Sequence, residues 1–142
     1  MRIPRVLVID DDPTIARIAK LTLRSRGYDV VVSEDTHSGL IELFREKTNL
    51  ILLDYMLPEQ NGLSFLKEIR SDPELAEIPV IMITTTGLSE VVQAAVILGA
   101  SDFIAKPFNL QNLIDRVARL VPMPDKGLDD QDSRIITTEE AG

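Results

Sequence analysis

The chain has no cysteine, no tryptophan and a single histidine among its 142 residues. Without cysteine it can form no disulfide, offer no thiol nucleophile and bind no metal through thiolates. One histidine cannot build a multi-histidine metal site or a histidine relay. The length still suffices for one ordinary domain with its own hydrophobic core.

Long apolar runs and a basic excess are also missing. No segment approaches the roughly 20 apolar residues that span a bilayer, and the N-terminus lacks the apolar core of a signal peptide. We therefore expect a cytoplasmic protein without a membrane partner. The 23 acidic residues outnumber the 15 basic ones, which gives a net charge of −8. Because phosphate contacts require a basic face, we expect no direct nucleic-acid binding by this chain.

Residues 122–142 carry half of this net charge. They hold six acidic and two basic residues, whereas the first 121 residues hold 17 acidic and 13 basic ones. They also contain Pro122, Pro124 and Gly127 and few large apolar side chains. The composition predicts a flexible acidic tail or linker after a domain that comprises residues 1–121.

Short apolar runs alternate with longer amphipathic stretches along that domain. Runs without polar alternation are typical of strands buried on both faces of a parallel sheet. They occupy 6–9, 29–33, 50–53, 80–83 and 102–105. Helical spacing of apolar residues predicts helices at 14–26, 37–46, 62–71, 89–98 and 110–121. The alternation predicts an α/β fold: a doubly wound, flavodoxin-like sheet of five parallel strands in the order 2-1-3-4-5, with five helices.

Reactive side chains stand where four of the expected strands end. Asp10, Asp11 and Asp12 follow the first strand, Asp54 the third, Thr84 the fourth and Lys106 the fifth. Taken singly, each has an ordinary role, such as helix capping for an aspartate before proline. Because the carboxyl ends of parallel strands meet at one rim, where ligands bind in such sheets, we expect these side chains to converge.

The residue types favour phosphoryl chemistry at this rim. Clustered carboxylates repel one another unless a cation joins them, and all-oxygen sites suit Mg²⁺. A carboxylate such as Asp54 can act as a nucleophile and form an acyl phosphate. The Lys106 ammonium and the Thr84 hydroxyl would position and neutralise the phosphoryl oxygens.

Four segments resemble the receiver domain of bacterial two-component response regulators. They are Val8-Ile-Asp-Asp-Asp-Pro13, Leu52-Leu-Asp-Tyr-Met-Leu-Pro-Glu-Gln-Asn-Gly62, Pro79-Val-Ile-Met-Ile-Thr84 and Gly99-Ala-Ser-Asp-Phe-Ile-Ala-Lys-Pro-Phe108. The resemblance covers about residues 4–121. It implies that Asp54 accepts a phosphoryl group from a sensor histidine kinase or a phosphotransfer protein. The domain would be no enzyme beyond self-catalysed phosphotransfer and slow autodephosphorylation. The resemblance also implies that the residue two beyond Asp54 tunes access of water to the acyl phosphate. Because Met56 lacks a carboxamide that could orient water, we expect a phosphoryl lifetime that is not especially short.

The resemblance also implies the metal site. Asp11 and Asp54 would bind Mg²⁺ directly, Asp10 would act through a bound water, and the backbone carbonyl of Met56 would be a further ligand. Lys106 would contact the phosphoryl group, and a cis bond to Pro107 would shape its loop.

A conformational switch completes the implied mechanism. Thr84 would swing toward the phosphoryl group and Phe103 would turn inward, although Phe103 could also be a permanently buried core ring. The face formed by 89–98, 102–105 and 110–121 would then change for a downstream protein target or a homodimer. Residues 91–101 carry no charge. We therefore expect Val91, Ala94 and Leu98 to be exposed as a partner face.

Two other readings stay open. Asp10 and Asp12 also fit haloacid-dehalogenase-like phosphatases, with Asp10 as nucleophile, although no further acidic pair follows at a later strand end. The domain could alternatively be a receiver-like scaffold that signals without phosphate. Mapping the acyl phosphate to Asp54 or to Asp10 distinguishes these classes.

Overall fold

The structure, a computed structural model, describes residues 3–85 and 89–123. Five parallel strands form one sheet in the order β2-β1-β3-β4-β5. The strands are β1 (Arg5–Ile9), β2 (Asp29–Ser33), β3 (Leu50–Asp54), β4 (Val80–Thr84) and β5 (Asp102–Ala105). The predicted α/β fold and its strand order are confirmed.

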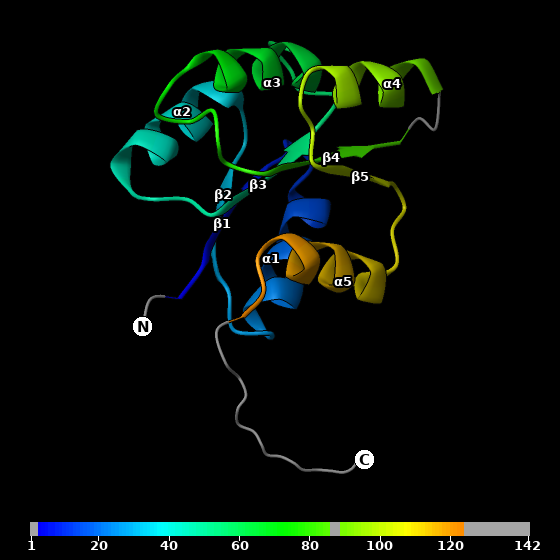
Figure 1. Cartoon of the computed structure of the whole chain (residues 1–142). Helices are drawn as coiled ribbons and strands as arrows, with labels where there is room; N and C mark the ends of the chain where they lie inside the picture. Colours follow the sequence, from blue (N-terminus) through cyan, green and yellow to red (C-terminus); the bar gives the residue numbers. More distant parts are fainter. Residues whose placement is uncertain (1–2, 86–88, 124–142) are drawn as a thin grey trace.

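Four helices connect successive strands and a fifth follows the last strand, which matches the predicted five helices. They are α1 (Pro13–Arg24), α2 (Thr36–Arg45), α3 (Gly62–Ser71), α4 (Ser89–Ile97) and α5 (Leu110–Leu120). Helices α1 and α5 cover one face of the sheet, and α2, α3 and α4 cover the other (Figure 1). Asp12, Asp35, Asn61 and Asn109 each accept a backbone N–H at the start of a helix. These caps explain why four of the helices begin where they do.

The central strands are buried from end to end, so they read as unbroken apolar runs. Successive side chains of a strand point to opposite faces. In β1, Val6 and Val8 therefore pack with α1 and α5, whereas Leu7 and Ile9 pack with α2 and α3. Apolar cover on both faces leaves the strand ends as the place where polar side chains can meet.

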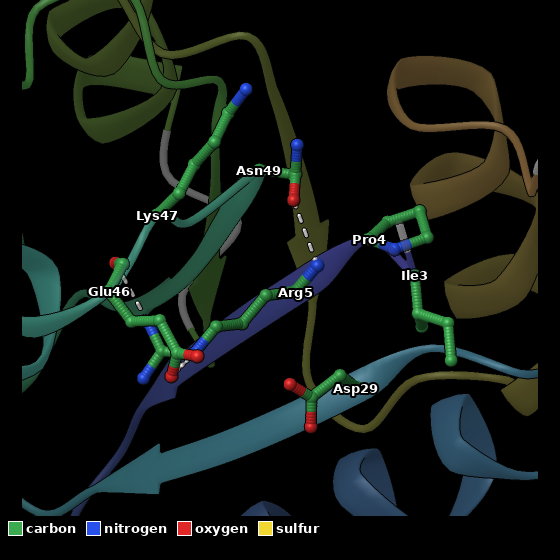
Figure 2. Close-up of a pocket in the computed structure, with 7 residues that line it drawn as sticks. All are labelled: Ile3, Pro4, Arg5, Asp29, Glu46, Lys47 and Asn49. Atoms are coloured by element: carbon green, nitrogen blue, oxygen red, sulfur yellow. Dashed lines mark hydrogen bonds and ion pairs between the residues drawn. The ribbon is translucent and has the colours of Figure 1, made fainter. Parts of the chain in front are cut away.

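A buried arginine fastens the amino end of the sheet. Arg5 is 3% exposed, and its guanidinium donates to Glu42 Oε1 at 2.6 Å and to Thr48 Oγ1 at 2.8 Å. Its backbone N–H donates to Asn49 Oδ1 at 2.9 Å (Figure 2). Arg5 thus joins β1 to α2 and to the loop before β3. A shallow pocket opens here, lined by Ile3, Pro4, Arg5, Asp29, Glu46, Lys47 and Asn49.

No helix in the described ranges is long and apolar enough to cross a membrane. The domain boundary expected after residue 121 stays a prediction. Of residues 122–142, expected to form a flexible acidic tail or linker, residues 124–142 lie outside the described residues.

The start of α3 lies directly against the end of β3. The Gly62 N–H donates to the Tyr55 carbonyl at 2.7 Å. A Cβ at Gly62 would lie 2.6 Å from the backbone oxygen of Asp54 and 2.9 Å from Tyr55 Cα. Only glycine permits this approach, because backbone atoms on the other side cannot yield. The contact holds the backbone of Asp54 in place.

We therefore expect Gly62→Ala to lower the free energy of unfolding by about 1–3 kcal/mol, the usual cost of overpacking. Urea unfolding followed by circular dichroism measures it. Lys67→Ala, at an exposed position of the same helix, is the control and should change stability by less than about 0.5 kcal/mol. Equal stability of Gly62→Ala and the parent chain would contradict the close-contact argument.

Candidate functional site

Strand register brings the reactive residues to one rim. Ile9 pairs with Leu53, Asp54 with Ile83, and Thr84 with Ala105. Each of Asp10 and Lys106 follows one of these positions directly. Asp10, Asp54, Thr84 and Lys106 therefore lie at the carboxyl ends of β1, β3, β4 and β5, respectively.

Three carboxylates gather at this rim. Asp10, Asp11 and Asp54 each offer an oxygen within 4.8 Å of the others. Asp10 and Asp54 are buried, and Asp11 is exposed. Asp10 Oδ1 accepts the backbone N–H of Asp12 at 2.9 Å, whereas the buried Asp10 Oδ2 accepts no hydrogen bond. Its only described partner is the Lys106 ammonium, which makes an ion pair without hydrogen-bond geometry.

Lys106 faces two of these carboxylates. Its Nζ lies 3.1 Å from Asp10 Oδ2 and 3.4 Å from Asp54 Oδ1. Burial works against its positive charge, but the two aspartates outweigh burial and raise the pKa of Lys106. The peptide bond to Pro107 is cis, and the Lys106 N–H donates to the Thr84 carbonyl at 2.7 Å. The ammonium is therefore permanent and fixed beside Asp54.

Asp54 has the most perturbed acidity of the site. Burial and the negative charge of Asp10 raise the pKa of Asp54 to about 6, although Lys106 and the Met56 N–H at 3.3 Å oppose the shift. Two buried carboxylates share one ammonium, so the site holds an excess of negative charge. A divalent cation among oxygen ligands would remove this excess, which suits Mg²⁺. The unsatisfied Asp10 Oδ2 fits such an ion.

The two expected switch residues lie on neighbouring strands. Thr84 ends β4 and is buried at 2% exposure. Phe103, in β5, is 36% exposed. The reading of Phe103 as a permanently buried core ring is therefore wrong, because β5 is an edge strand and its ring is accessible to solvent. Met56, whose backbone carbonyl was expected to bind metal, has an exposed side chain.

The apolar exposure of α4 differs from the prediction. Val91 and Ala94 are half-buried, and Leu98 packs against the core. Val96 and Ile97 are exposed instead, at 62% and 82%. Ala95 is buried and Leu98 packs against the core three residues later, so these two positions mark the inward side and the helix is rotated relative to the expected face. An uncharged stretch offers no polar side to fix this rotation in advance. The partner role of Val91, Ala94 and Leu98 stays a prediction.

Two structural supports escaped the sequence reasoning. Gly62 lies at the first position of the predicted helix 62–71, and the preceding Asn61, a helix cap, marks where the loop after β3 meets α3, but neither residue predicts the close contact with Asp54. Arg5 was given no role, because a charge at the start of a strand normally marks the boundary with solvent.

The structure thus combines a doubly wound parallel sheet with three aspartates and a lysine at its carboxyl rim. Residues 6–118 match the family described as the response regulator receiver domain. The chain belongs to this family, whose members act in two-component signalling, interact with histidine kinases or phosphotransfer proteins, and generally bind Mg²⁺ at an aspartate cluster.

Individual relatives agree with this assignment. Chemotaxis protein CheY1 of Helicobacter pylori is 38% identical, and the match covers 80% of this chain and 93% of that protein. The DNA-binding dual master transcriptional regulator RpaA of Synechocystis is 35% identical over 87% of this chain. The crystal structure of Vibrio cholerae CheY4 superposes with a TM-score of 0.80 at 28% identity, covering 84% of this chain and all of that one. The match spans 51% of RpaA, about half its length.

The raised pKa of Asp54 has a consequence for stability. Its value in the unfolded chain is near 3.8, and in the folded chain about 6. Ionised Asp54 therefore destabilises the fold above pH 6, and this cost fades as the pH falls toward 4. We expect Asp54→Asn to raise the free energy of unfolding by about 1–3 kcal/mol at pH 7.5 without divalent ions, and by less at pH 5.

Urea unfolding at both pH values measures this gain. Asp29→Asn, which removes an exposed carboxylate at the amino end of the sheet, is the control and should change stability by less than about 0.5 kcal/mol. A loss of stability in Asp54→Asn at pH 7.5 would show that the ion pair with Lys106 outweighs the burial of charge.

Proposed function

We propose that this domain relays a signal by reversible phosphorylation of Asp54. The observation that supports this most strongly is the placement of Asp54, buried, with an ammonium 3.4 Å away and two further carboxylates within 4.8 Å. Membership of the receiver family supports the same role. The phosphoryl donor would be a phosphohistidine of a sensor kinase or a phosphotransfer protein.

The transfer is a nucleophilic displacement at phosphorus. A carboxylate oxygen of Asp54 forms the new P–O bond while the donor's P–N bond breaks, and the histidine nitrogen leaves with the electron pair and takes up a proton. Lys106 is placed to neutralise the charge on the phosphoryl oxygens. Because the reaction requires the carboxylate, the proximity of Lys106 keeps a buried Asp54 available as the anion.

Asp10, Asp11 and Asp54, with the backbone carbonyl of Met56, would hold Mg²⁺. When bound, the ion supplies positive charge that offsets both the carboxylates and the transferred phosphoryl group. Asp11 is solvent-exposed, whereas Asp10 and Asp54 are buried. Asp11 would therefore be the ligand most accessible to an ion from solution.

The switch would run from β4 to β5. The Thr84 hydroxyl would bind the new phosphoryl oxygens and draw the end of β4 toward Asp54, and the Phe103 ring would turn inward. The face formed by α4, β5 and α5 would then change for a protein target or a second copy of the chain. Val96 and Ile97 give this face its exposed apolar surface.

The phosphatase reading is not favoured by the geometry. Asp12 would have to act as acid and base, but its carboxylate accepts the N–H groups of Thr14 and Ile15 as the cap of α1. The phosphate-independent scaffold is tested by the experiment below.

We expect a small acyl phosphate with Mg²⁺ to phosphorylate the chain once, at Asp54. Borohydride reduction followed by peptide mass spectrometry maps the acyl phosphate. Asp54→Asn should abolish the label and Lys106→Ala should reduce it at least tenfold, whereas the control Asp29→Asn should label normally. Label at Asp10 would establish the phosphatase reading, and no label in the parent chain would favour the scaffold.

We also expect Asp11→Asn to weaken Mg²⁺ binding at least tenfold, because it removes a charged ligand. Isothermal titration calorimetry measures the affinity. Asp12→Asn is a matched control, since it removes the neighbouring carboxylate while asparagine still caps α1. Equal losses in both variants would indicate a general effect of charge rather than a defined metal site.

A further inference from the structure

Helix α1 is the most basic element of the molecule. Residues 13–28 contain Arg17, Lys20, Arg24 and Arg26 and no acidic residue. Within 3–85 and 89–123, no carboxylate forms an ion pair with any of these four. The chain as a whole is strongly acidic, so this concentration of cations without a carboxylate partner is a local feature of one helix. The Arg24 guanidinium donates to the Val30 carbonyl at 3.0 Å, and no hydrogen bond to a carboxylate is described for any of the four.

The same helix exposes apolar side chains. Ala16, Ala19 and Leu23 are buried against the sheet. Leu21 is 52% exposed and Ile18 37% exposed. Arg17, Leu21 and Arg24 are three and four residues apart, so they share the outer face. We call Arg17, Ile18, Lys20, Leu21 and Arg24 the α1 surface. An occupant of this surface should combine negative charge with a few apolar residues.

The described chain ends beside one end of this surface. The Tyr28 hydroxyl donates to the Val121 carbonyl at 2.7 Å. The side chain of Met123 reaches Gly27, where a Cβ would lie 2.7 Å from Met123 Cε. A pocket at this junction is lined by Arg24, Ser25, Arg26, Gly27, Tyr28, Ile114, Ala118 and Met123. The C-terminal end of α5 thus lies next to the end of α1 (Figure 1). The chain continues from there with residue 124.

Residues 124–142 have the composition that the α1 surface requires. They contain six acidic residues against two basic ones, and the apolar pair Ile135-Ile136. The acidic residues are Asp125, Asp129, Asp130, Asp132, Glu139 and Glu140. The thirteen residues 124–136 can span roughly 40 Å when extended. Helix α1, with its 12 residues, is roughly 18 Å long, so the isoleucine pair can reach any part of it.

We propose that residues 124–142 bind in cis along the α1 surface. The acidic residues 125–132 lie along Arg24, Arg17 and Lys20, and Ile135-Ile136 cover Leu21 and Ile18. The attachment point, the sign of the charges, the apolar pair and the reach all fit this occupant.

Other exposed apolar surfaces fit the segment less well. On α2, Ile41 and Phe44 are 55% and 54% exposed, but the neighbouring Arg45 is paired with Glu42 at 2.8 Å. On α4, the only charged residue is Glu90, which would repel an acidic segment. Residues 124–142 are acidic, so their charge complements the basic α1 surface better than the surfaces of α2 and α4.

The absence of cysteine in the native chain makes the test direct. Ser133→Cys in the full chain introduces a unique thiol for a nitroxide label. The signals of ¹⁵N-labelled protein are compared with the label oxidised and reduced, without phosphodonor. We expect paramagnetic loss of the α1 amide signals, centred on Leu21, at low salt. The loss should diminish at 1 M salt, where the screening length is only about 3 Å.

Charge variants test the specificity. Arg17→Glu/Arg24→Glu should abolish the signal loss on α1, and adding Asp129→Lys/Asp130→Lys should restore it. Lys47→Glu/Lys67→Glu is the matched control, because it makes the same change in net charge at exposed positions away from α1. It should leave the loss unchanged.

Several results would overturn the proposal. They are signal loss centred on α2 or α4, no loss anywhere, or a loss that the α1 charge reversal leaves intact. A loss that appears when spin-labelled ¹⁴N protein is mixed with unlabelled ¹⁵N protein would show that a second copy binds instead. None of these readouts depends on Asp54, so failure here is distinct from failure of the proposed function.

Discussion

The chemistry of the site depends on one electrostatic arrangement: two buried carboxylates, Asp10 and Asp54, facing a single ammonium, that of Lys106. One positive charge cannot balance two negative ones where the side chains are buried. The site therefore lowers the stability of the fold until a cation or a proton neutralises the excess negative charge. The same imbalance makes the site responsive. A metal ion, a proton or a covalently attached phosphoryl group each changes the local charge, and each acts on groups held by the ends of different strands.

The sheet makes this arrangement possible because apolar side chains cover both of its faces. Strands β1, β3 and β4 are buried throughout, which confines polar chemistry to their ends. The order 2-1-3-4-5 then sets β1, β3 and β4 side by side. The contact of Gly62 with the backbone of Asp54 and Tyr55 ties α3 to the same rim. The position of the nucleophile is therefore a property of the packed backbone and does not rely on loop conformation alone.

The fold and the convergence of Asp10, Asp11, Asp54 and Lys106 could be predicted from the sequence. Strands buried on both faces appear as unbroken apolar runs, and the polar residues that follow these runs mark the strand ends. The sequence did not predict the exposed side of a helix that lies in an uncharged stretch. Residues 91–101 lack charge, so no polar side chain indicates which side of α4 faces the core, and Val96 and Ile97 are exposed in place of the expected residues. Arg5 was missed for the opposite reason: its charge suggested solvent, whereas its partners on α2 and before β3 bury it.

Arg5 stabilises the end of the sheet that lies opposite the carboxylate site. Arg5 and the rim that carries Asp10, Asp54 and Lys106 stand at opposite ends of β1, about 17 Å apart along the strand. At the amino end, the Arg5 guanidinium donates hydrogen bonds to α2 and to the loop before β3. At the carboxyl end, the close contact of Gly62 with the backbone of Asp54 and Tyr55 has the corresponding effect. Both ends of the sheet are thus held by contacts from outside the strands, so Asp54 belongs to a backbone that is fixed at each end.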